Sequence, residues 1–543
     1  MVADKQPRWW QRGVIYQIYP RSFKDSNDDG IGDLQGIIDK LDYLNDGTPN
    51  SLGIDAIWLS PFFKSPMADF GYDVSDYCDI DPIFGDLATF DHLVEAAHQH
   101  GIKIIIDYVP NHSSDQHRWF IESRCGRDNP KRDWYIWRDA KPDGSPPNNW
   151  GSWFGGSAWE WDELTGQYYL HSFVKEQPDL NWANPEVYAA MMDVLHFWMK
   201  RGVDGFRMDV VFLLVKAPGL PDNPWNPDAD PNLLENDIAG RQLHLYDRSQ
   251  PPAIYDRMRE FRRLTDQYGD TCIVGEIWEP ELSEWIKYYG DEHDGVADGL
   301  HLPFNFDLME IPIWDAGLMR ASVDKLEAAV PTFAQPNYVL GNHDRPRLAT
   351  RYGVANVRTA AMLLLTLRGT PTLYNGDEIG MEDGKIPLDR IVDPQGVNLG
   401  AERSRDGCRT PLQWDSNTYA GFSAIDPWLP VAENYPTRNV AVQNDDPGST
   451  LSFYRKLLWY RKGSPALHSG SYQPIDSVEG TYIYQREYDG ERKLIGLNFT
   501  DQSKIVNLPA SGKIVLSTGL DRGEIVNDTV TLRPQEGIII ELA

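Results

Sequence analysis

Residues 205–210 read Gly-Phe-Arg-Met-Asp-Val, and the rest of the chain is interpreted outward from them. They follow a helix-like run at 184–201 and a short apolar segment, the order expected where a helix leads into a buried strand. Side chains at alternate strand positions face the same way, so Arg207 and Asp209 point to one side. An arginine beside a carboxylate favours the ionised form and fixes its orientation. The stretch therefore predicts a strand that ends in a carboxylate nucleophile, with a purely structural Arg–Asp pair as the alternative.

Short apolar segments alternate with helix-like segments on both sides of this stretch, a pattern typical of βα units around a parallel sheet. Residues 90–100 show an apolar repeat of helical period that stops at Gly101, where a helix C-terminal cap belongs. Eight strands with helices between them predict an α/β fold, the (β/α)8 TIM barrel, whose active site lies at the carboxyl ends of the strands. The strands are expected at 14–19, 54–59, 102–106, 203–208, 272–276, 300–306, 337–340 and 372–374, and further helices at 37–44, 357–367 and 449–461.

Two segments depart from this repeat. Residues 111–182 show no helix–strand alternation and are rich in Trp, Asn, Asp, Gly and Pro, and they are too long for an ordinary loop. They are interpreted as a domain inserted after strand 3. Residues 463–543 carry short apolar strands separated by Gly, Asn and Asp, which predicts a C-terminal antiparallel β-sandwich domain. Residues 1–110 and 183–462 then form the catalytic barrel.

The composition restricts the possible partners and location. The 543 residues include 81 acidic and 51 basic residues, a net charge of −30 that disfavours nucleic acid and anionic membranes. No secretion-type apolar segment begins the chain, and the longest apolar runs are too short to span a bilayer. A soluble, cytoplasmic monomer or homodimer is expected. The scattered cysteines, without a CxxC motif, are expected to be reduced core residues: Cys78, Cys125, Cys272 and Cys408.

Polar side chains gather at the predicted strand ends. Each alone is consistent with a solvated or salt-bridged strand end. Their convergence on one barrel mouth is hard to explain by packing, because buried like charges are costly unless function needs them. A catalytic site is therefore expected among these residues: Asp107, His112, Arg207, Asp209, Glu276, His343 and Asp344.

Four blocks of this region resemble the sequence regions of the α-amylase family, glycoside hydrolase family 13. The blocks are DYVPNH (107–112), GFRMD (205–209), EIW (276–278) and NHD (342–344). The resemblance extends over the barrel, the insertion and the C-terminal β domain. The stretches QPDLN (177–181) and RDGCRTP (405–411) are similar to the α-glucosidase and oligo-1,6-glucosidase branch, which acts on short sugars.

The resemblance implies a retaining double displacement. Asp209 would attack the anomeric carbon to form a glucosyl-enzyme ester, and Glu276 would protonate the leaving oxygen and later deprotonate water. A neighbouring anionic Asp209 favours the protonated form of Glu276 that this requires. Retention requires the two carboxyl groups to lie roughly 5–5.5 Å apart. Asp344 would bind the 2- and 3-hydroxyls of the sugar, and Arg207 would orient Asp209.

The resemblance also implies the shape of the pocket. Asp69 and Arg405 match an ion pair that closes the site behind the terminal glucose, and Tyr72 matches the aromatic residue that stacks beneath it. A closed pocket implies exo action, the release of one glucose at a time from disaccharides and short oligosaccharides, with transglucosylation as a side activity. The partners are then small α-glucosides. Further expected substrate contacts are His112, Phe173, Gln177 and His343.

Val210 follows the expected nucleophile. In relatives a valine here accompanies α-1,6 cleavage, because its methyl groups lie beside the leaving sugar; ordinary strand packing of a β-branched residue is the alternative. Isomaltose-type substrates are therefore favoured, with maltose and sucrose left open. A sucrose isomerase or a trehalose synthase on the same fold is the alternative function, although the RLDRD-type signature of sucrose isomerases is not found. A catalytically inactive relative is disfavoured, because the carboxylates are present.

Residues 25–33 read DSNDDGIGD and have the first part of a calcium loop, with glycine at the sixth position. The twelfth position is Gly36, so the loop is not an EF-hand. It resembles a structural Ca²⁺ or Mg²⁺ loop after the first barrel strand in this branch; an acidic turn satisfied by water and backbone is the alternative. No catalytic metal or organic cofactor is expected. The expected ligands are Asp25, Asn27, Asp29, the carbonyl of Ile31, and Asp33.

Overall fold

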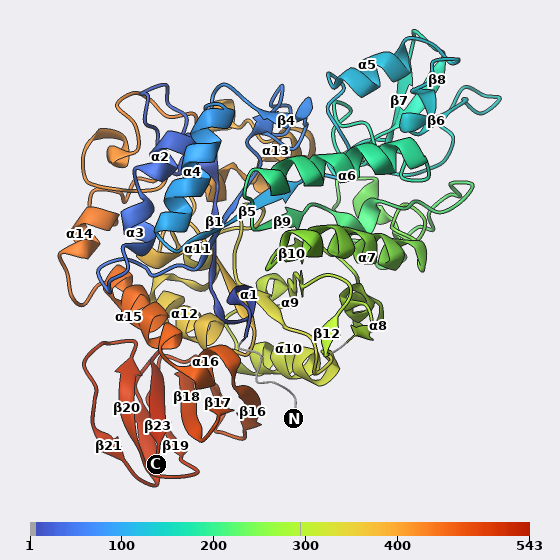
Figure 1. Ribbon diagram of the computed structural model, residues 1–543. Helices are drawn as coiled ribbons and strands as arrows, with labels where there is room; N and C mark the ends of the chain where they lie inside the picture. Colours follow the sequence, from blue (N-terminus) through green and yellow to red (C-terminus); the bar gives the residue numbers. More distant parts are fainter. Residues whose placement is uncertain (1–6, 294) are drawn as a thin grey trace.

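The computed structural model describes residues 7–293 and 295–543, and its centre is a ring of parallel strands (Figure 1). Their order around the ring is β13-β10-β9-β5-β2-β1-β15-β14. A parallel bridge between Asn305, just after β13, and Tyr338 in β14 closes the ring between the two ends of this order. The predicted TIM barrel is confirmed. The barrel strands are β1 (Ile15–Ile18), β2 (Ala56–Leu59), β5 (Lys103–Tyr108), β9 (Gly205–Met208), β10 (Cys272–Gly275), β13 (Leu302–Pro303), β14 (Asn337–Val339) and β15 (Thr370–Tyr374).

Both faces of the barrel strands are buried. Ile15, Trp58 and Val274 belong to one apolar cluster inside the barrel, whereas Tyr16 and Ile57 belong to the larger core between strands and helices. Strands buried on both faces occur as continuous apolar runs rather than as alternating patterns. This is why the runs at 14–19, 54–59 and 102–106 were recognisable as strands.

Helices surround the barrel at the predicted places, and side-chain caps fix where several of them begin. Asp86 accepts a hydrogen bond from the Thr89 amide (2.8 Å), and Asn184 caps a helix that has Pro185 at its first position. The main helices are α4 (Leu87–Gln99), α6 (Pro185–Lys200), α7 (Ala253–Thr265), α10 (Ala316–Ala329), α12 (Val357–Thr366) and α15 (Thr450–Lys462).

The prediction of a single helix at 37–44 is wrong. The structure has two short helices there, α2 (Leu34–Ile38) and α3 (Leu41–Asn45). Asp33 caps α2 by accepting from the Gly36 amide, which moves its start upstream. The backbone then leaves the helical region at Lys40, with ψ at 10°, so the two turns cannot continue into one another.

The segment between β5 and α6 forms a separate lobe at the upper right of Figure 1. It contains α5 (Arg118–Arg124) and an antiparallel sheet in the order β6 (Trp137–Arg138), β8 (Gln167–Leu170), β7 (Trp159–Asp162). Trp150, Trp159 and Leu170 pack together within it. These residues form a small core together with Leu220 of a later loop, whereas other aromatic residues of the lobe, such as Trp134 and Trp137, join the main core.

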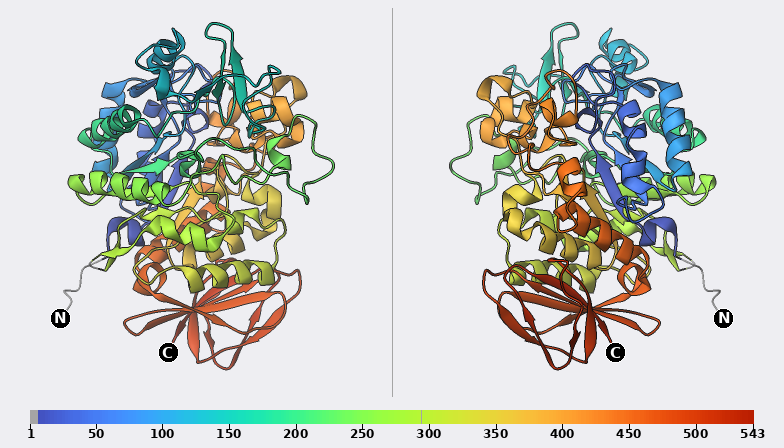
Figure 2. Two further views of the ribbon diagram at one scale, coloured as in Figure 1. Left: turned by 90° about the vertical axis from the view of Figure 1, so that its right-hand side faces the viewer. Right: turned by 90° about the vertical axis from the view of Figure 1, so that its left-hand side faces the viewer.

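The C-terminal strands form two antiparallel sheets that share an apolar core, which includes Val506, Leu532 and Ile540. Figures 1 and 2 show this sandwich at the opposite end of the molecule from the inserted lobe. One short helix, α16 (Pro465–Ser469), precedes it. The six-stranded sheet has the order β16 (Ser471–Ile475), β17 (Thr481–Tyr488), β18 (Glu491–Asn498), β23 (Gly537–Leu542), β20 (Gly512–Ser517), β21 (Ile525–Val526), and the second sheet pairs β19 (Lys504–Asn507) with β22 (Thr529–Leu532).

Two sequence-based expectations concern the whole chain. Throughout residues 7–293 and 295–543, no helix is both long and apolar enough to cross a membrane. Cys272 and Cys408 are buried and Cys78 is partly buried, but Cys125 is exposed at the end of α5. The prediction that all four cysteines are core residues is therefore wrong for Cys125.

Candidate active site

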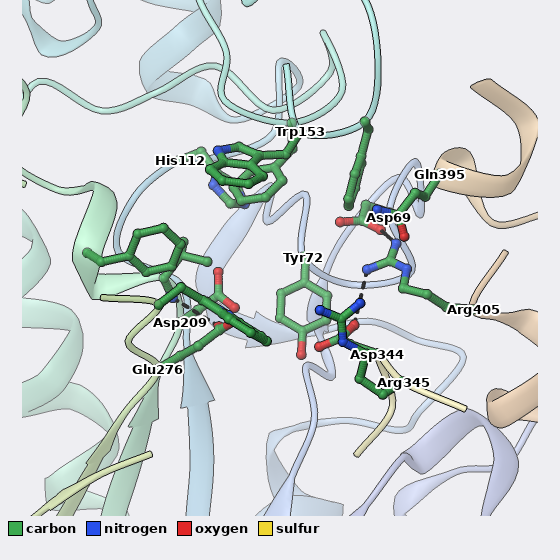
Figure 3. A pocket seen from close by; sticks show the side chains of 15 residues that line it. Asp69, Tyr72, His112, Trp153, Asp209, Glu276, Asp344, Arg345, Gln395 and Arg405 are labelled. Carbon is green, nitrogen blue, oxygen red and sulfur yellow. Dashed lines mark hydrogen bonds and ion pairs between the residues drawn. The ribbon is translucent and has the colours of Figure 1, made fainter. Parts of the chain in front are cut away.

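The strand ends of the barrel bring the expected residues around one cavity of about 280 Å³ (Figure 3). Asp209 and Glu276 directly follow β9 and β10, and Asp344 lies on the loop after β14. Across the cavity from Asp209 and Glu276 lie Asp344 and Arg345, with Tyr72 between the two groups. Of the predicted residues, the cavity is lined by Asp69, Tyr72, His112, Phe173, Asp209, Val210, Glu276, Asp344 and Arg405.

Arg207 links three carboxyl groups at the base of the cavity. Its Nη1 donates to Asp107 Oδ1 (2.8 Å) and to Asp209 Oδ1 (2.7 Å), and its Nη2 donates to Glu276 Oε2. The two expected catalytic carboxylates are thus held by the two terminal nitrogens of one planar group. Arg207 lies behind them, where it fixes both in orientation.

One positive charge facing three carboxyl groups favours retention of a proton in the cluster. Burial raises the pKa of Asp209 well above its usual value; Arg207 opposes this rise and Glu276 adds to it. Burial likewise raises the pKa of Asp107 to about 6, against the effect of Arg207. Arg207 favours the ionised form of Asp209, as expected from the sequence, and burial acts against it. The cluster titrates as a unit.

Two further donors fix Glu276. Trp278 Nε1 donates to Glu276 Oε1 (2.9 Å), and the Val210 amide donates to Glu276 Oε2 (3.2 Å). Val210 has φ at 36° and ψ at 45°, a left-handed conformation that is unusual for a β-branched residue. Such strain clusters at functional sites. In Val210 the strained backbone conformation occurs at the residue whose amide donates to Glu276.

A hydrogen-bonded series beneath the pocket orients Tyr72. Gln17 Nε2 lies 2.7 Å from His343 Nδ1 and donates to it, which leaves the proton of the neutral imidazole on Nε2, 2.6 Å from the Tyr72 hydroxyl. Tyr72 in turn donates to Asp107 Oδ2 (3.2 Å). Burial lowers the pKa of His343 to about 3, so the ring is neutral at ordinary pH. His343 therefore lies behind Tyr72 and does not line the cavity. The sequence analysis expected it to contact the sugar directly.

Asp344 accepts from Arg405 Nη1 (3.2 Å) and from Arg409 Nη2 (3.1 Å). Burial would raise its pKa, but His343, Arg405 and Arg409 together hold the pKa of Asp344 well below the usual range. Because His343 is neutral, we assign most of this effect to the two arginines. Asp344 thus remains an anionic hydrogen-bond acceptor.

An ion-pair network closes one side of the cavity. Arg405 Nη2 donates to Asp69 Oδ1 (2.9 Å) and to Asp393 Oδ1 (2.7 Å). Gln177 Nε2 donates to Asp69 Oδ2 (3.2 Å) and lies 3.1 Å from His112 Nε2. Gln177 is fully buried behind this wall, where it orients Asp69 and His112.

An aromatic wall adjoins this network. Phe173 packs edge-on against His112 with ring centroids 5.1 Å apart, and burial lowers the pKa of His112 to about 4. Phe173 also belongs to an apolar group with Val210 and Phe212. The site therefore combines a charged base and closed end with an apolar rim that limits access of water.

Several residues of the site were not predicted. Two lay within recognised motifs: Trp278 in EIW and Arg409 in RDGCRTP. Arg345 directly follows the NHD block, and Gln395 lies on the short helix α13 (Pro394–Leu399). The others lie on loops or in short turns, where no periodicity marks them: Trp153, Phe154, Phe212 and Asp393.

The loop at 25–33 lies apart from this cavity. Asp25 is buried, and its carboxylate accepts from the amides of Asn27, Asp28 and Gly30. The Asp33 carboxylate is engaged by Ser26 and by the amide at the start of α2. Within the described residues no group of three or more His, Cys, Asp or Glu side chains could hold a metal. The donor set is all oxygen, which suits Ca²⁺ or Mg²⁺, and the metal stays a prediction.

Comparison with known proteins gives extensive matches. The family model described as "Alpha amylase, catalytic domain" matches residues 17–470. A probable alpha-glucosidase of Rhizobium meliloti (strain 1021) is 40% identical over 514 residues, 92% of this chain and 91% of that protein. An oligo-1,6-glucosidase of Parageobacillus thermoglucosidasius is 37% identical over 576 residues, 98% and 99% of the two chains.

Solved structures agree over the whole chain. The alpha-glucosyl transfer enzyme XgtA has a TM-score of 0.91 at 41% identity and covers 99% of this chain and 100% of its own. The trehalulose synthase MutB of Pseudomonas mesoacidophila MX-45 has a TM-score of 0.88 at 36% identity, with the same coverage.

Proposed function

The chain belongs to the α-amylase family of glycoside hydrolases, and from this premise we propose that it is a retaining, exo-acting α-glucosidase of short α-glucosides. The observation that carries the proposal is the pairing of Asp209 and Glu276 on the Arg207 guanidinium. Two carboxyl groups held side by side in one small cavity suit a double displacement, in which one is nucleophile and the other acid and base.

In the first step Asp209 attacks the anomeric carbon of the terminal glucose. Glu276 gives its proton to the departing glycosidic oxygen, and the glucosyl unit becomes esterified to Asp209. This step requires a protonated Glu276 beside an anionic Asp209. Ion pairing with Arg207 then stabilises each carboxylate when it is anionic.

In the second step Glu276 removes a proton from water, which attacks the same carbon and releases α-glucose with retained configuration. A sugar hydroxyl in place of water gives transglucosylation. Asp344, which its two arginines keep anionic, accepts hydrogen bonds from the 2- and 3-hydroxyls of the ring.

Exo action is supported by the closed end of the cavity. The Asp69–Arg405 ion pair and the small volume, about 280 Å³, leave room for one sugar ring beyond the scissile bond. Ligand pockets typically span roughly 300–1,000 Å³. Internal cleavage of soluble starch at the rate of maltose would contradict this part of the proposal.

The assignment of roles is tested by small-anion rescue of Asp209→Ala and Glu276→Ala with p-nitrophenyl α-glucoside. Loss of activity by about 10⁴-fold or more is expected for Asp209→Ala. Azide should then occupy the place of the missing carboxylate and yield the inverted β-glucosyl azide, whereas Glu276→Ala should yield the retained α-azide. The opposite pattern would reverse the two roles, and full activity in either variant would refute the proposal.

The leaning towards α-1,6 linkages rests on Val210 and on the likeness to oligo-1,6-glucosidases. Initial rates on maltose, isomaltose, trehalose and sucrose give the linkage preference directly.

We further propose that residues 25–33 bind a structural Ca²⁺ or Mg²⁺, and that the protein is a cytoplasmic monomer or homodimer.

A glucosyl transferase or sucrose isomerase is the second candidate. It is favoured by the likeness to a glucosyl transfer enzyme and a trehalulose synthase, and by the aromatic rim at Trp153, Phe173 and Phe212. Such enzymes use the same carboxylates and differ in how well they exclude water. Incubation with concentrated sucrose separates the two, because a hydrolase yields glucose and fructose and an isomerase yields isomaltulose or trehalulose.

A further inference from the structure

Trp153, which lines the catalytic cavity (Figure 3), stacks on a histidine from a distant segment of the chain. The rings of Trp153 and His244 have centroids 4.1 Å apart and an interplanar angle of 21°. Trp153 belongs to the inserted lobe, whereas His244 belongs to the long loop between β9 and α7. The same indole packs against Phe212 and the apolar group that includes Val210. The stack therefore joins two segments that meet at the wall of the cavity.

The hydrogen bonds of His244 require a proton on both ring nitrogens. Nδ1 lies 2.6 Å from Asp247 Oδ2, and Nε2 lies 3.0 Å from the Ala239 carbonyl oxygen. A carbonyl and an ionised carboxylate can only accept. Burial would raise the pKa of Asp247, but the hydrogen bond from His244 lowers it, and the pKa lies below its usual value. His244 is therefore an imidazolium in this arrangement, unlike the neutral His112 and His343 of the site.

The charge on His244 strengthens its contact with Trp153. A cation over the face of an aromatic ring is attracted by the ring's quadrupole, and tryptophan gives the strongest contact of this kind. The two hydrogen bonds fix the imidazolium plane, so the indole has one preferred orientation beside the cavity. Loss of either proton would place a lone pair against the Asp247 carboxylate or the Ala239 carbonyl. Deprotonation would therefore release Trp153 as well as His244.

The surrounding charges leave Asp247 as the direct partner of His244. The inserted lobe presents the uncharged indole of Trp153 to the imidazolium. Three cationic side chains of the loop between β9 and α7 are engaged by other groups: Lys216 by Asp179 (2.9 Å), Arg241 by the Leu233 carbonyl (2.6 Å) and Arg248 by Glu279 (3.9 Å). The proton shared between His244 and Asp247 therefore controls the stack.

We infer that His244, as an imidazolium, is a positioning residue for substrate binding, which holds Trp153 at the catalytic cavity and makes the affinity for the α-glucoside depend on its proton. The inference rests on the proposed function and concerns binding of the substrate, separately from the carboxyl chemistry. Within the described chain His244 is not among the residues that line the cavity, so it acts through Trp153.

The test measures kcat and KM for p-nitrophenyl α-glucoside over the range in which histidine changes charge, about pH 5–9. In the wild type, KM should rise about fivefold towards the alkaline end, as expected for the loss of one cation–π contact. His244→Arg, which stays charged and can donate to both acceptors, should keep the low KM throughout. His244→Phe, which keeps a ring without charge or hydrogen bonds, should have the high KM at every pH. At each pH, kcat should agree within about twofold among the three proteins.

Tryptophan fluorescence gives a readout that does not require activity or a folded His244 variant. An imidazolium in contact with an indole quenches its emission, so emission of the wild type should increase over the same pH range as KM. The chain has 19 tryptophans, so the change is measured as the difference between the wild type and Trp153→Phe. Absence of this increase would show that His244 does not hold Trp153 through its charge, and would overturn the inference.

His196→Phe is the matched control, because His196 is also half-buried and bonded to another side chain, the Tyr268 hydroxyl, outside the catalytic cavity. This variant should retain the wild-type KM at each pH and the fluorescence change. A wild-type KM that is independent of pH, or a rise in KM that persists in His244→Arg, overturns the inference while leaving the glucosidase proposal intact. Failure of the wild type to cleave the glucoside at any pH overturns both.

Discussion

Arg207 faces Asp107, Asp209 and Glu276, and this imbalance of charge controls the chemistry of the site. The sequence predicted that these four residues gather at one barrel mouth, but not that one guanidinium contacts all three carboxyl groups, nor how deeply the cluster is buried. Both depend on which strands become neighbours, since β9 lies between β5 and β10. The sequence therefore identified the residues of the cluster, whereas their shared contact with Arg207 is visible only in the folded chain.

Asp107→Asn should change how stability depends on pH. The pKa of Asp107 is raised to about 6 in the folded protein, so its contribution to stability is fully present below the unfolded pKa and is lost as the pH rises through about 6. The free energy of unfolding of the wild type, relative to the variant, should fall by about 3 kcal/mol between pH 4 and 6 and then level off. Denaturant titrations across this range measure it. The exposed Asp228→Asn should show no such change, and a flat difference for Asp107→Asn would contradict the burial argument.

Val210→Thr tests linkage preference at the residue beside Asp209. Threonine is β-branched like valine, so the left-handed backbone at position 210 strains both residues similarly. It replaces one methyl group by a hydroxyl next to the leaving sugar. The ratio of kcat/KM for isomaltose over maltose should fall about tenfold, within the range for a small change in a pocket wall. Val210→Ile, which keeps the apolar branch, should retain the wild-type ratio. An unchanged preference in Val210→Thr would leave the valine with a packing role only.

At the scale of elements, strands were more predictable than the loops that complete the site. The strands carrying Asp107, Arg207 and Ile273 are buried on both faces and occur as unmistakable apolar runs. In contrast, β13 is only Leu302–Pro303, because the residues after it turn into α9 (Asp307–Glu310), so the expected strand at 300–306 was too long. Loop residues such as Asp393 have no periodic signal, and only the folded chain brings them to Arg405.

The loop at 25–33 yields a prediction about metal binding. If Ca²⁺ binds there, it stabilises the folded state by mass action, about 2.7 kcal/mol at a hundredfold excess over Kd. Calcium should raise the Tm of chelator-treated protein, and Asp29→Ala should abolish that rise. Asp28→Ala is the matched control in the same loop, because its side chain accepts from the Ala424 amide instead. A Tm that is indifferent to both calcium and chelator would favour the acidic turn.

At the scale of the whole molecule, two buried arginines bind the C-terminal end of α12: Arg461 from α15 of the barrel, and Arg486 from β17, which joins the sandwich to the barrel. Arg461 donates to the carbonyls of Leu365 and Gly369, and Arg486 donates to those of Thr366 and Gly470. The carbonyls of Leu365, Thr366 and Gly369 lie at and just beyond the end of α12, where the helix dipole favours positive charge. Gly470 directly follows α16. Nothing in the sequence marked the two arginines, because their partners are backbone atoms of a distant helix.

Arg486→Met should weaken this junction without affecting catalysis. The side chain is fully buried, so its loss leaves several carbonyls unpaired, at a cost of about 3 kcal/mol. A lower denaturation midpoint is expected, with kcat/KM unchanged where the protein is folded, because no described residue lining the catalytic pocket comes from 463–543. Lys513→Met, at an exposed position of the same sheet, should change neither. Equal midpoints for the two variants would show that the arginine contributes no stability.

The bridge between Asn305 and Tyr338 is the sole pairing by which β13 meets β14 in the described chain. The other neighbouring strands of the barrel pair through two or more residues, whereas β13 and β14 are joined by one bridge. Local opening of the barrel is therefore expected first between β13 and β14. Amides flanking the bridge are expected to exchange with solvent sooner than those of β5 or β9. Because Asp344 lies on the loop that follows β14, the least secured edge of the barrel wall leads directly to one of the carboxylates of the active site.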